Sequence, residues 1–152
     1  MTKQSAGILL YRQKKELEVF LVHPGGPFFA HKDLGVWTIP KGEFFSGEDP
    51  LEAAKREFEE ETGQQITGNF IALHTIKQKG GKLVMAWALA GDIDADCIVS
   101  NTFEIIWPPK SGRRQIFPEV DRAAWFSIAK AREKMNEKQI AFLDELEQHL
   151  NQ

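Results

Sequence analysis

WTIPKGEFFSGEDPLEAAKREFEEETGQ, residues 37–64, is the stretch that decides the fold of this chain. Its second half is crowded with carboxylates, because Glu57, Glu59, Glu60 and Glu61 fall within five consecutive positions. These positions are predicted to form the last turns of a helix, where the helix dipole has its negative pole. Like charges three or four positions apart also repel each other. A sequence that breaks a local rule this plainly usually gains something in return, and a bound cation is the simplest gain.

The helix that carries these glutamates has predicted ends. Asp49 is a suitable N-cap, Pro50 fits the first turn, and Gly63 supplies the C-terminal cap. Apolar residues at i, i+3 and i+7 spacing share one face that is expected to pack on a sheet, namely Leu51, Ala54 and Phe58. A neighbouring face presents three of the carboxylates, those of Glu57, Glu60 and Glu61.

Three carboxylates at i, i+3 and i+4 can direct their oxygens to one small volume. Hard oxygen ligands select Mg²⁺ or Mn²⁺ over softer metals, and the chain has no Cys and His set with zinc spacing. Gly42, in a glycine-containing loop before the helix, can bring a backbone carbonyl to the same ion. Arg56 starts from a different side of the helix, and it is expected to form an ion pair that orients the glutamates.

A solvated charged face is the ordinary interpretation of a run of glutamates. It is weaker here because Gly42, Glu48, Arg56 and Gly63 are spaced around the run. For Arg56 the corresponding alternative is a solvated side chain without a partner.

The rest of the chain is expected to form a frame for this helix. Short apolar runs predict strands over residues 5–11, 17–23, 36–39, 69–76, 83–90, 101–107 and 119–126. The first two strands are expected to pair as a hairpin, and so are the fourth and fifth. Glycine and proline predict loops over residues 24–35 and 108–118, and periodic apolar residues predict helices over 128–134 and 137–150. This order predicts an α/β fold with a mixed sheet and helices on both faces.

Composition limits the kind of protein. At 152 residues the chain fits a single domain, residues 1–152, and its net charge of -3 gives no field that would attract nucleic acid. No apolar run approaches the about 18 residues of a membrane span, and residues 1–13 hold too short an apolar run for a signal peptide. Cys97 is the one cysteine, which is expected to be a buried or half-buried thiol and fits a reducing cytosol. The sequence therefore predicts a cytoplasmic protein.

The spacing of the motif residues resembles the signature of the Nudix hydrolases. Gly42 is followed after five residues by Glu48, and after seven more by residues 56–63, REFEEETG. The family pattern is G-x5-E-x7-R-E-U-x-E-E-x-G-U, in which U is a bulky aliphatic residue, and every fixed position matches. Two positions depart from the pattern, because Phe58 replaces the usual Leu or Ile and Gln64 occupies the final apolar position.

The resemblance implies a fold, a reaction and a set of site residues. Nudix enzymes fold as an α/β/α sandwich around a mixed sheet and use Mg²⁺ or Mn²⁺. They hydrolyse a pyrophosphate bond in a nucleoside diphosphate linked to another moiety X. By motif position, the metal ligands would be the Gly42 carbonyl and the carboxylates of Glu57, Glu60 and Glu61. Glu60 or Glu61 would also orient the attacking water, and Arg56 would hold the catalytic helix in place.

In many Nudix enzymes the general base lies outside the motif, late in the chain. Glu119, in PEVDRAAWF, resembles the glutamate that the family often carries before its last strand. Glu104, in NTFEIIW, is the second candidate. A structural role is the alternative for both residues.

The segments around the motif are expected to decide the substrate. Residues 37–42, WTIPKG, are similar to a segment of the dinucleoside tetraphosphate and diphosphoinositol polyphosphate hydrolase branch, in which the lysine, here Lys41, lies near phosphates. The turn that contains Arg113 and Arg114 either supplies bidentate phosphate contacts or is an ordinary solvated turn. Four aromatic residues are candidates to stack a base, namely Phe28, Phe29, Trp87 and Trp107. For Trp87, packing in the core is favoured instead.

The sequence thus predicts a Mg²⁺-dependent Nudix pyrophosphohydrolase that acts on a nucleotide. Dinucleoside polyphosphates are the first choice of substrate and nucleoside triphosphates the second. The rival prediction is a non-catalytic nucleotide-binding sensor or regulatory module on the same fold, which typically loses a metal glutamate. No nucleic acid or membrane partner is expected, and the chain is expected to be a monomer or a homodimer.

Overall fold

A seven-stranded mixed sheet lies at the centre of the fold in the computed structural model, which describes residues 3–151. Its strands are β1 (Gln4–Gln13), β2 (Leu17–Pro24), β3 (Lys41–Glu43), β4 (Ile71–Ala72), β5 (Ile76–Lys77), β6 (Leu83–Ala90) and β9 (Val120–Ser127). The main path is β4–β6–β1–β2–β9, with β3 paired to β1 and β5 to β6. β1 and β6 run parallel, whereas the other pairs are antiparallel.

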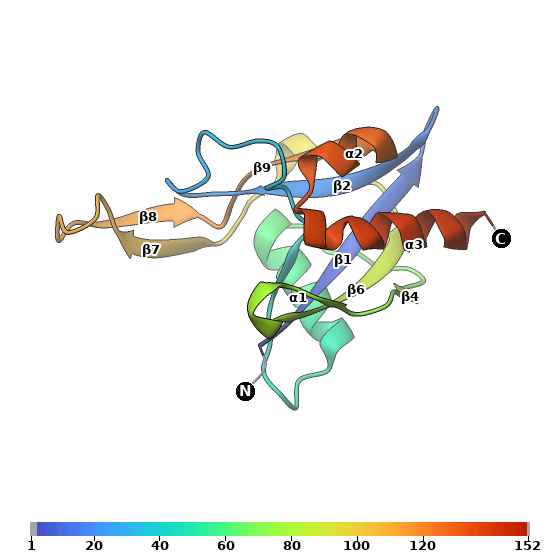
Figure 1. The fold of residues 1–152 in the computed structure, drawn as a ribbon, viewed down its shortest axis with the longest axis horizontal. Coiled ribbons are helices and arrows are strands. Elements are labelled where there is room, and N and C mark those ends of the chain that lie inside the picture. Colours follow the sequence, from blue (N-terminus) through green and yellow to red (C-terminus); the bar gives the residue numbers. More distant parts are fainter. Residues whose placement is uncertain (1–2, 152) are drawn as a thin grey trace.

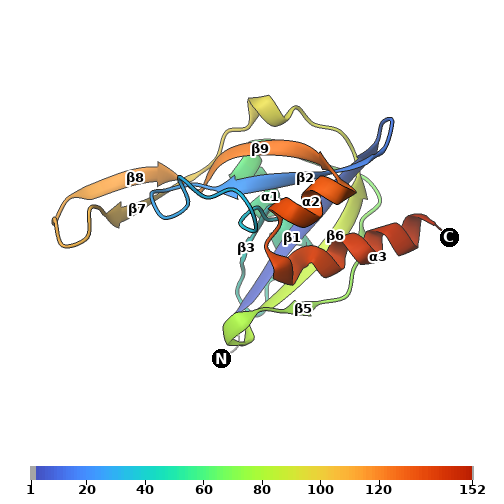
Figure 2. The same ribbon diagram turned by 45° about the horizontal axis from the view of Figure 1, so that its top comes forward.

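Helices cover both faces of this sheet, as Figure 1 and Figure 2 show. α1 (Pro50–Thr62) lies on one face, and α2 (Ile128–Lys134) and α3 (Ile140–Leu150) lie on the other. A separate apolar cluster fills each interface. The first cluster contains Ala53, Ala54 and Phe58 of α1, and the second contains Phe142, Leu143 and Leu146 of α3. The predicted α/β/α sandwich around a mixed sheet is therefore confirmed.

The ends of α1 follow from the residues next to them. Asp49 accepts a hydrogen bond from the Glu52 backbone N–H at 3.0 Å, as an N-cap does. Gly63 has a φ of 76° and donates its N–H to the Glu59 carbonyl oxygen at 2.7 Å. The predicted limits of this helix are confirmed, and Phe58 is buried against the sheet.

The strand predicted over residues 36–39 is wrong. Trp37 and Thr38 form only isolated bridges, and the strand β3 begins at Lys41 instead, opposite the start of β1. A free strand edge can pair with any extended segment that reaches it, and local propensity does not say which segment will. Gly42 therefore lies in a strand and not in the predicted loop.

Three further predictions differ in their limits. The strand predicted over 69–76 is split into β4 and β5, because the His74 N–H turns away to the Glu145 carboxylate. The predicted loop 108–118 contains a strand, β8 (Arg114–Pro118), which pairs with β7 (Thr102–Ile106) in a separate two-stranded sheet. A 3-10 turn, Glu137–Gln139, precedes α3, which begins three residues later than predicted. The other predicted elements are confirmed, including the β1–β2 hairpin.

The two-stranded sheet projects from one end of the molecule. In both views β7 and β8 extend away from α1, with their connecting turn at the far end (Figure 1, Figure 2). The loop between β2 and β3 packs on this hairpin, because a Cβ added at Gly26 would lie 2.8 Å from the Phe103 ring. The Phe28 ring of the same loop stands edge to face with Trp107, with ring centroids 5.3 Å apart.

Cys97 is exposed, so the predicted buried thiol is wrong. It ends a short 3-10 turn on the surface, and its Sγ–H donates to Asp94 Oδ2 at 3.2 Å. Within residues 3–151, no helix combines the length and the apolar character needed to cross a membrane. The predicted domain also includes Met1, Thr2 and Gln152, which lie outside the described residues.

Candidate active site

Glu57 and Glu61 both contact the short strand β3. The Lys41 backbone N–H donates to Glu61 Oε1 at 3.3 Å. Gly42 lies so close to Glu57 that a Cβ added at this glycine would be 2.0 Å from Glu57 Oε2. The two glutamates are about one turn apart on α1, so both reach the same three-residue strand. The close approach of a carboxylate, and not an unusual φ, is what requires glycine at position 42.

Arg56 joins the carboxylates of the motif. Its Nε donates to Glu48 Oε2 at 3.2 Å, and its Nη1 donates to Glu57 Oε1 at 3.0 Å and to Glu60 Oε1 at 3.1 Å. Arg56 leaves the helix on a different side from the cluster, but its side chain is long enough to reach these oxygens. The predicted ion pair with the glutamates is therefore present, and it also includes Glu48.

Burial and mutual repulsion change the acidity of the group. Burial raises the pKa of Glu61 to about 8, although the charge of Lys41 opposes this rise. Burial, and then the charge of Glu60, raise the pKa of Glu57 and likewise that of Glu119. These raised pKa values indicate that ionised carboxylates are disfavoured here by burial and by their mutual repulsion, and a bound cation would relieve both effects.

The donor set fits a hard divalent metal ion. The residues that could hold it are Glu57, Glu60 and Glu61, with Gly42 beside the first of them. Among residues 3–151, no three acidic, histidine or cysteine side chains come together closely enough to form a ready metal-binding group. Arg56 Nη1 serves as the cation for Glu57 and Glu60 at this place. A divalent ion would compete with this guanidinium for the same oxygens.

Of the two candidate bases, Glu119 lies beside this group and Glu104 does not. Asn101 connects Glu119 to α1, because its N–H donates to the Glu60 carbonyl oxygen at 2.7 Å and its own carbonyl oxygen accepts the Glu119 N–H at 2.8 Å. Glu104 instead forms an exposed ion pair with Arg114, at 2.9 Å, on the projecting hairpin. Sequence reasoning missed Asn101, since it acts through its backbone and no motif marks it.

The basic residues predicted to bind substrate fall in two places. Lys41 lies at the carboxylates, and its pKa is lowered by burial and further by the charge of Lys82, although Glu61 opposes the shift. Lys82 is a second basic residue of this region that the sequence did not single out. Arg113 and Arg114 lie at the turn end of the hairpin, which extends away from α1 (Figure 1, Figure 2). The structure does not bring these two arginines to the glutamates.

The aromatic candidates also separate. Phe28 is 59% exposed, and together with the half-buried Trp107 it forms an open aromatic pair between the loop and the hairpin. Trp87 packs against the apolar cluster beneath α1, as expected for a core residue. Phe29 is half-buried, with Lys32 Nζ 5.6 Å from the centre of its ring. Of these four candidates, Phe28 is the exposed one, so its pair with Trp107 presents the most open surface on which a planar ligand could stack.

Comparison with known sequences identifies a family. A family model described as NUDIX domain matches residues 1–146 of this chain. No curated protein matches the chain in a sequence search.

Solved structures share the fold over nearly the whole chain. They include a C. elegans Ap4A hydrolase in a binary complex, with 22% identity, a TM-score of 0.65, and 99% of this chain and 98% of that chain covered. The NUDIX domain of Shewanella oneidensis NrtR, complexed with ADP ribose, has 15% identity, a TM-score of 0.68, and 99% and 89% coverage. A MutT protein from Methanosarcina mazei Go1 has 18% identity, a TM-score of 0.65, and 99% and 96% coverage. At these identities the likeness establishes the shared fold.

Proposed function

The chain belongs to the Nudix hydrolase family, and on this premise we propose that it is a divalent-metal-dependent pyrophosphohydrolase that acts on a nucleotide. The proposed substrate is a nucleoside diphosphate linked to another moiety X, and the proposed ion is Mg²⁺, with Mn²⁺ as a substitute. One observation carries the proposal, namely that Glu57 and Glu61 converge on the β3 backbone, at Gly42 and at Lys41 respectively, where burial disfavours their ionised forms in the absence of a further cation. Carboxylates that share a hard cation with substrate phosphates are the usual arrangement for phosphate chemistry.

The motif residues are proposed to hold the ion. Glu57, Glu60 and Glu61 would supply carboxylate oxygens and Gly42 its carbonyl oxygen. When bound, the ion would neutralise phosphate charge and make a nearby water more acidic. Arg56 keeps Glu57 and Glu60 oriented through the two hydrogen bonds from Nη1.

Glu119 is proposed to be the general base. Burial and the charge of Glu60 raise its pKa, which makes its carboxylate a better proton acceptor. In the proposed step a water oxygen attacks one phosphorus in line, the bond from that phosphorus to the bridging oxygen breaks, and the water proton goes to Glu119. Glu60 or Glu61 helps to orient the water.

A dinucleoside polyphosphate is the proposed substrate, and a nucleoside triphosphate is the second candidate. The similarity of residues 37–42 to the dinucleoside tetraphosphate branch supports this choice, and so does the position of Lys41 at the carboxylates. The open pair Phe28–Trp107 lies on the hairpin side of the molecule and would stack a base at the far end of an extended substrate. Arg113 and Arg114 would contact phosphates or ribose at that end.

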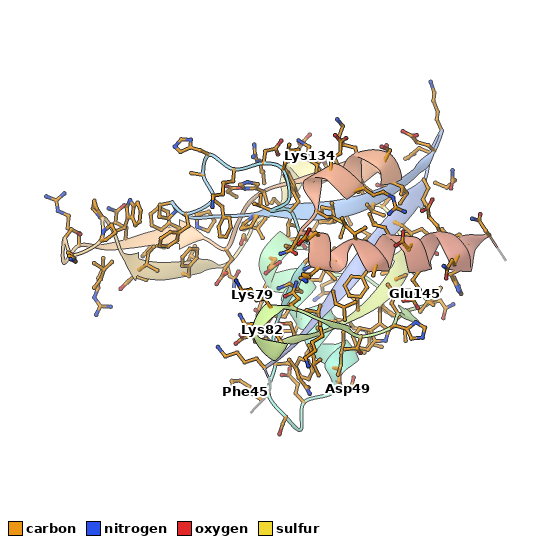
Figure 3. All side chains as sticks on the ribbon, viewed as in Figure 1. Phe45, Asp49, Lys79, Lys82, Lys134 and Glu145 are labelled. Atoms are coloured by element: carbon orange, nitrogen blue, oxygen red, sulfur yellow. The ribbon has the colours of Figure 1, made fainter. Side chains whose placement is uncertain are left out.

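Removing the aromatic pair is expected to weaken substrate binding. Phe28→Ala or Trp107→Ala is expected to raise KM for a dinucleoside polyphosphate about tenfold with little change in kcat, because stacking on a base contributes about 1–3 kcal/mol. The matched control is Phe45→Ala, since Phe45 is 85% exposed but lies far from the hairpin (Figure 3). An unchanged KM in both hairpin variants, or an equal rise in the control, would contradict the assignment.

Removing the proposed base is expected to slow the chemical step. Glu119→Gln is expected to lower kcat about a hundredfold or more at similar KM, because an amide cannot accept the proton and a general base contributes about 10²–10⁴. Glu104→Gln is the control, since Glu104 pairs with Arg114 on the exposed hairpin and is expected to be dispensable. Near wild-type turnover in Glu119→Gln would remove this residue from the mechanism.

A phosphate-release assay tests the proposed function directly. The purified chain would be incubated with Mg²⁺ and a panel of nucleoside triphosphates, dinucleoside polyphosphates, sugar nucleotides and inositol pyrophosphates. Turnover that stops with a chelator and returns with Mg²⁺ is the expected result. Nucleotide binding without turnover of any substrate would instead support the rival, a sensor or regulatory module. The presence of all three motif glutamates favours the enzyme.

The setting of the reaction is proposed from composition. The lone cysteine favours the reducing cytoplasm, and the net charge of -3 favours a small nucleotide over nucleic acid as the partner. A single domain over residues 1–152, acting as a monomer or a homodimer, is the proposed unit.

A further inference from the structure

A buried histidine lies where β2 and β9 meet, outside the group of glutamates. His23 is 0% exposed, and both of its ring nitrogens have hydrogen-bond partners. Nδ1 lies 2.8 Å from Asp121 Oδ1, and Nε2 lies 2.7 Å from the Lys32 carbonyl oxygen. The proposed reaction does not involve this residue. No sequence pattern marks the contact, because Asp121 is 98 positions away.

The partners of the ring hold it from two sides. The Lys32 carbonyl oxygen can only accept, so the Nε2–H of the ring donates to it. On the other side, Nδ1 is in hydrogen-bond contact with the Asp121 carboxylate. His23 is therefore fixed in orientation between a carboxylate and a carbonyl oxygen.

Two further charged groups lie around the contact between His23 and Asp121. Arg122 Nε lies 4.0 Å from Asp121 Oδ1, and its guanidinium lies over the Trp37 ring that His23 contacts edge to face. Asp33 accepts a hydrogen bond from Nε1 of the same tryptophan at 2.9 Å.

Asp121 is the extra residue of a β-bulge. In the β2–β9 ladder, Arg122 pairs with His23 and Val120 pairs with the next residue of β2, so Asp121 has no backbone partner there. The side-chain contact with His23 thus holds the bulged residue in place. A bulge changes the direction in which neighbouring side chains point. Val120 is turned into the apolar cluster beneath α1, and Glu119 comes directly before it.

The Glu119 backbone is held from two sides. Its carbonyl oxygen accepts the Gly25 N–H at 2.9 Å, and its N–H donates to the Asn101 carbonyl oxygen at 2.8 Å. Gly25 comes two residues after His23, and Asn101 is itself bonded to the Glu60 carbonyl oxygen at 2.7 Å. A continuous path of short contacts therefore joins the buried histidine to the proposed base and to α1.

We propose that His23 is a positioning residue, whose contacts with Asp121 and the Lys32 carbonyl fix the bulge and the β2–β3 loop so that Glu119 lies beside the glutamates of α1. This role rests on the proposed function, in which Glu119 accepts a proton from water. His23 touches no substrate in this role. The contact at Nε2 also ties down the loop that carries Phe28, so the base and the substrate loop depend on the same ring.

A double-mutant cycle separates positioning from a general loss of stability. His23→Asn is expected to lower kcat about tenfold in the wild type but to have no further effect in Glu119→Gln, because no base remains to be positioned. Urea unfolding is measured for the wild type, the two single variants and the double variant, so that kcat is compared only between folded proteins. The control is His74→Asn, which breaks another histidine–carboxylate contact of 2.8 Å, with Glu145 on α3. Its effect on kcat is expected to be negligible in both backgrounds.

Asp121→Asn keeps the cycle usable if His23→Asn does not fold. The asparagine has nearly the same shape, but its neutral amide replaces the carboxylate and weakens the contact with Nδ1. We expect it to lower kcat in the same way as His23→Asn, by a smaller factor, and again only when Glu119 is present.

Nitrogen NMR of the labelled wild-type protein supplies a readout that needs no substrate. The Nε2–H of His23 is expected to exchange slowly with solvent, because it is buried and bonded to the Lys32 carbonyl oxygen, and rapid exchange of this hydrogen would overturn the proposed contact. If the wild type is active and the two single losses in kcat combine fully in the double mutant, the positioning role is overturned while the proposed function stands. A wild type that turns over no substrate would overturn the proposed function, and the positioning role with it.

Discussion

Glu61→Gln is expected to remove nearly all turnover while making the metal-free protein more stable. The variant loses one of the carboxylates proposed to hold the ion, at the position where the Lys41 N–H meets α1. A fall in kcat of about a thousandfold is expected, since single charged groups in such sites contribute about 10²–10⁴. Mg²⁺-dependent phosphate release, on the best substrate of the panel, measures it.

The gain in stability follows from the pKa of Glu61. This pKa is about 8 in the folded chain against an ordinary value of 4.5, so the folded state holds the proton more tightly than the unfolded state. The resulting stability is fully present below pH 4.5 and is lost as the pH rises through about 8. Glutamine stays neutral and keeps this stability. At about 1.4 kcal/mol per pKa unit, the variant gains on the order of a few kcal/mol over the wild type at alkaline pH.

A loss of activity together with a gain in the free energy of unfolding would exclude misfolding as the cause of the lost turnover. Urea unfolding of the metal-free proteins across this pH range measures the stability, and Mg²⁺ is expected to stabilise the wild type more than the variant. Glu59→Gln is the control, because Glu59 lies on the exposed side of α1 and its carboxylate accepts a hydrogen bond from Gln65, away from the other glutamates of the motif. Full turnover in Glu61→Gln would refute the proposed site, and equal pH profiles would refute the burial of this carboxyl.

The limits of α1 were predictable because they depend on neighbours in the chain. Asp49 bonds to a residue three positions on, and Gly63 bonds to a residue four positions back, so the sequence contains both partners. The motif spacing is local in the same sense, since residues one turn apart share a face. Local rules therefore predicted the helix and the side of it on which these glutamates lie.

The remaining parts of the site depend on pairings between distant segments. β3 exists because Gly42 meets Ala6 across the sheet, and the choice of Glu119 over Glu104 depends on Asn101, which only the fold brings to α1. Propensity carries no information on which strand edge a segment will join. The same reason explains why the strand β8 was taken for a loop and why the contact of His23 with Asp121 was missed.

Gly42→Ala is expected to lower turnover about a hundredfold in a protein that still folds. The new Cβ would lie 2.0 Å from Glu57 Oε2 and 2.1 Å from its Cδ, so the carboxylate has to move. This carboxylate is the end of a flexible side chain, and the Gly42 backbone has no positive φ, so the strand itself accepts alanine. A displacement of about 1 Å in a reacting group costs about 10²-fold in rate.

Gly7→Ala is the contrasting variant on the neighbouring strand. Its Cβ would lie 2.5 Å from the Pro40 carbonyl oxygen, a backbone atom that cannot swing aside. Gly7→Ala is therefore expected to lower the midpoint of thermal unfolding more than Gly42→Ala does. Turnover per folded molecule is expected to fall more in Gly42→Ala, and the reverse order in either measurement would contradict this explanation.

Combining Gly42→Ala with Glu57→Gln distinguishes the two roles proposed for this glycine. Alanine keeps the carbonyl oxygen of residue 42 and changes only the space beside Glu57, so the double variant is expected to be no worse than Glu57→Gln alone. A further loss of turnover or of Mg²⁺ binding in the double variant would mean that the added methyl also displaces the carbonyl. In that case the backbone ligand, and not the room left for Glu57, would explain why glycine stands at this position.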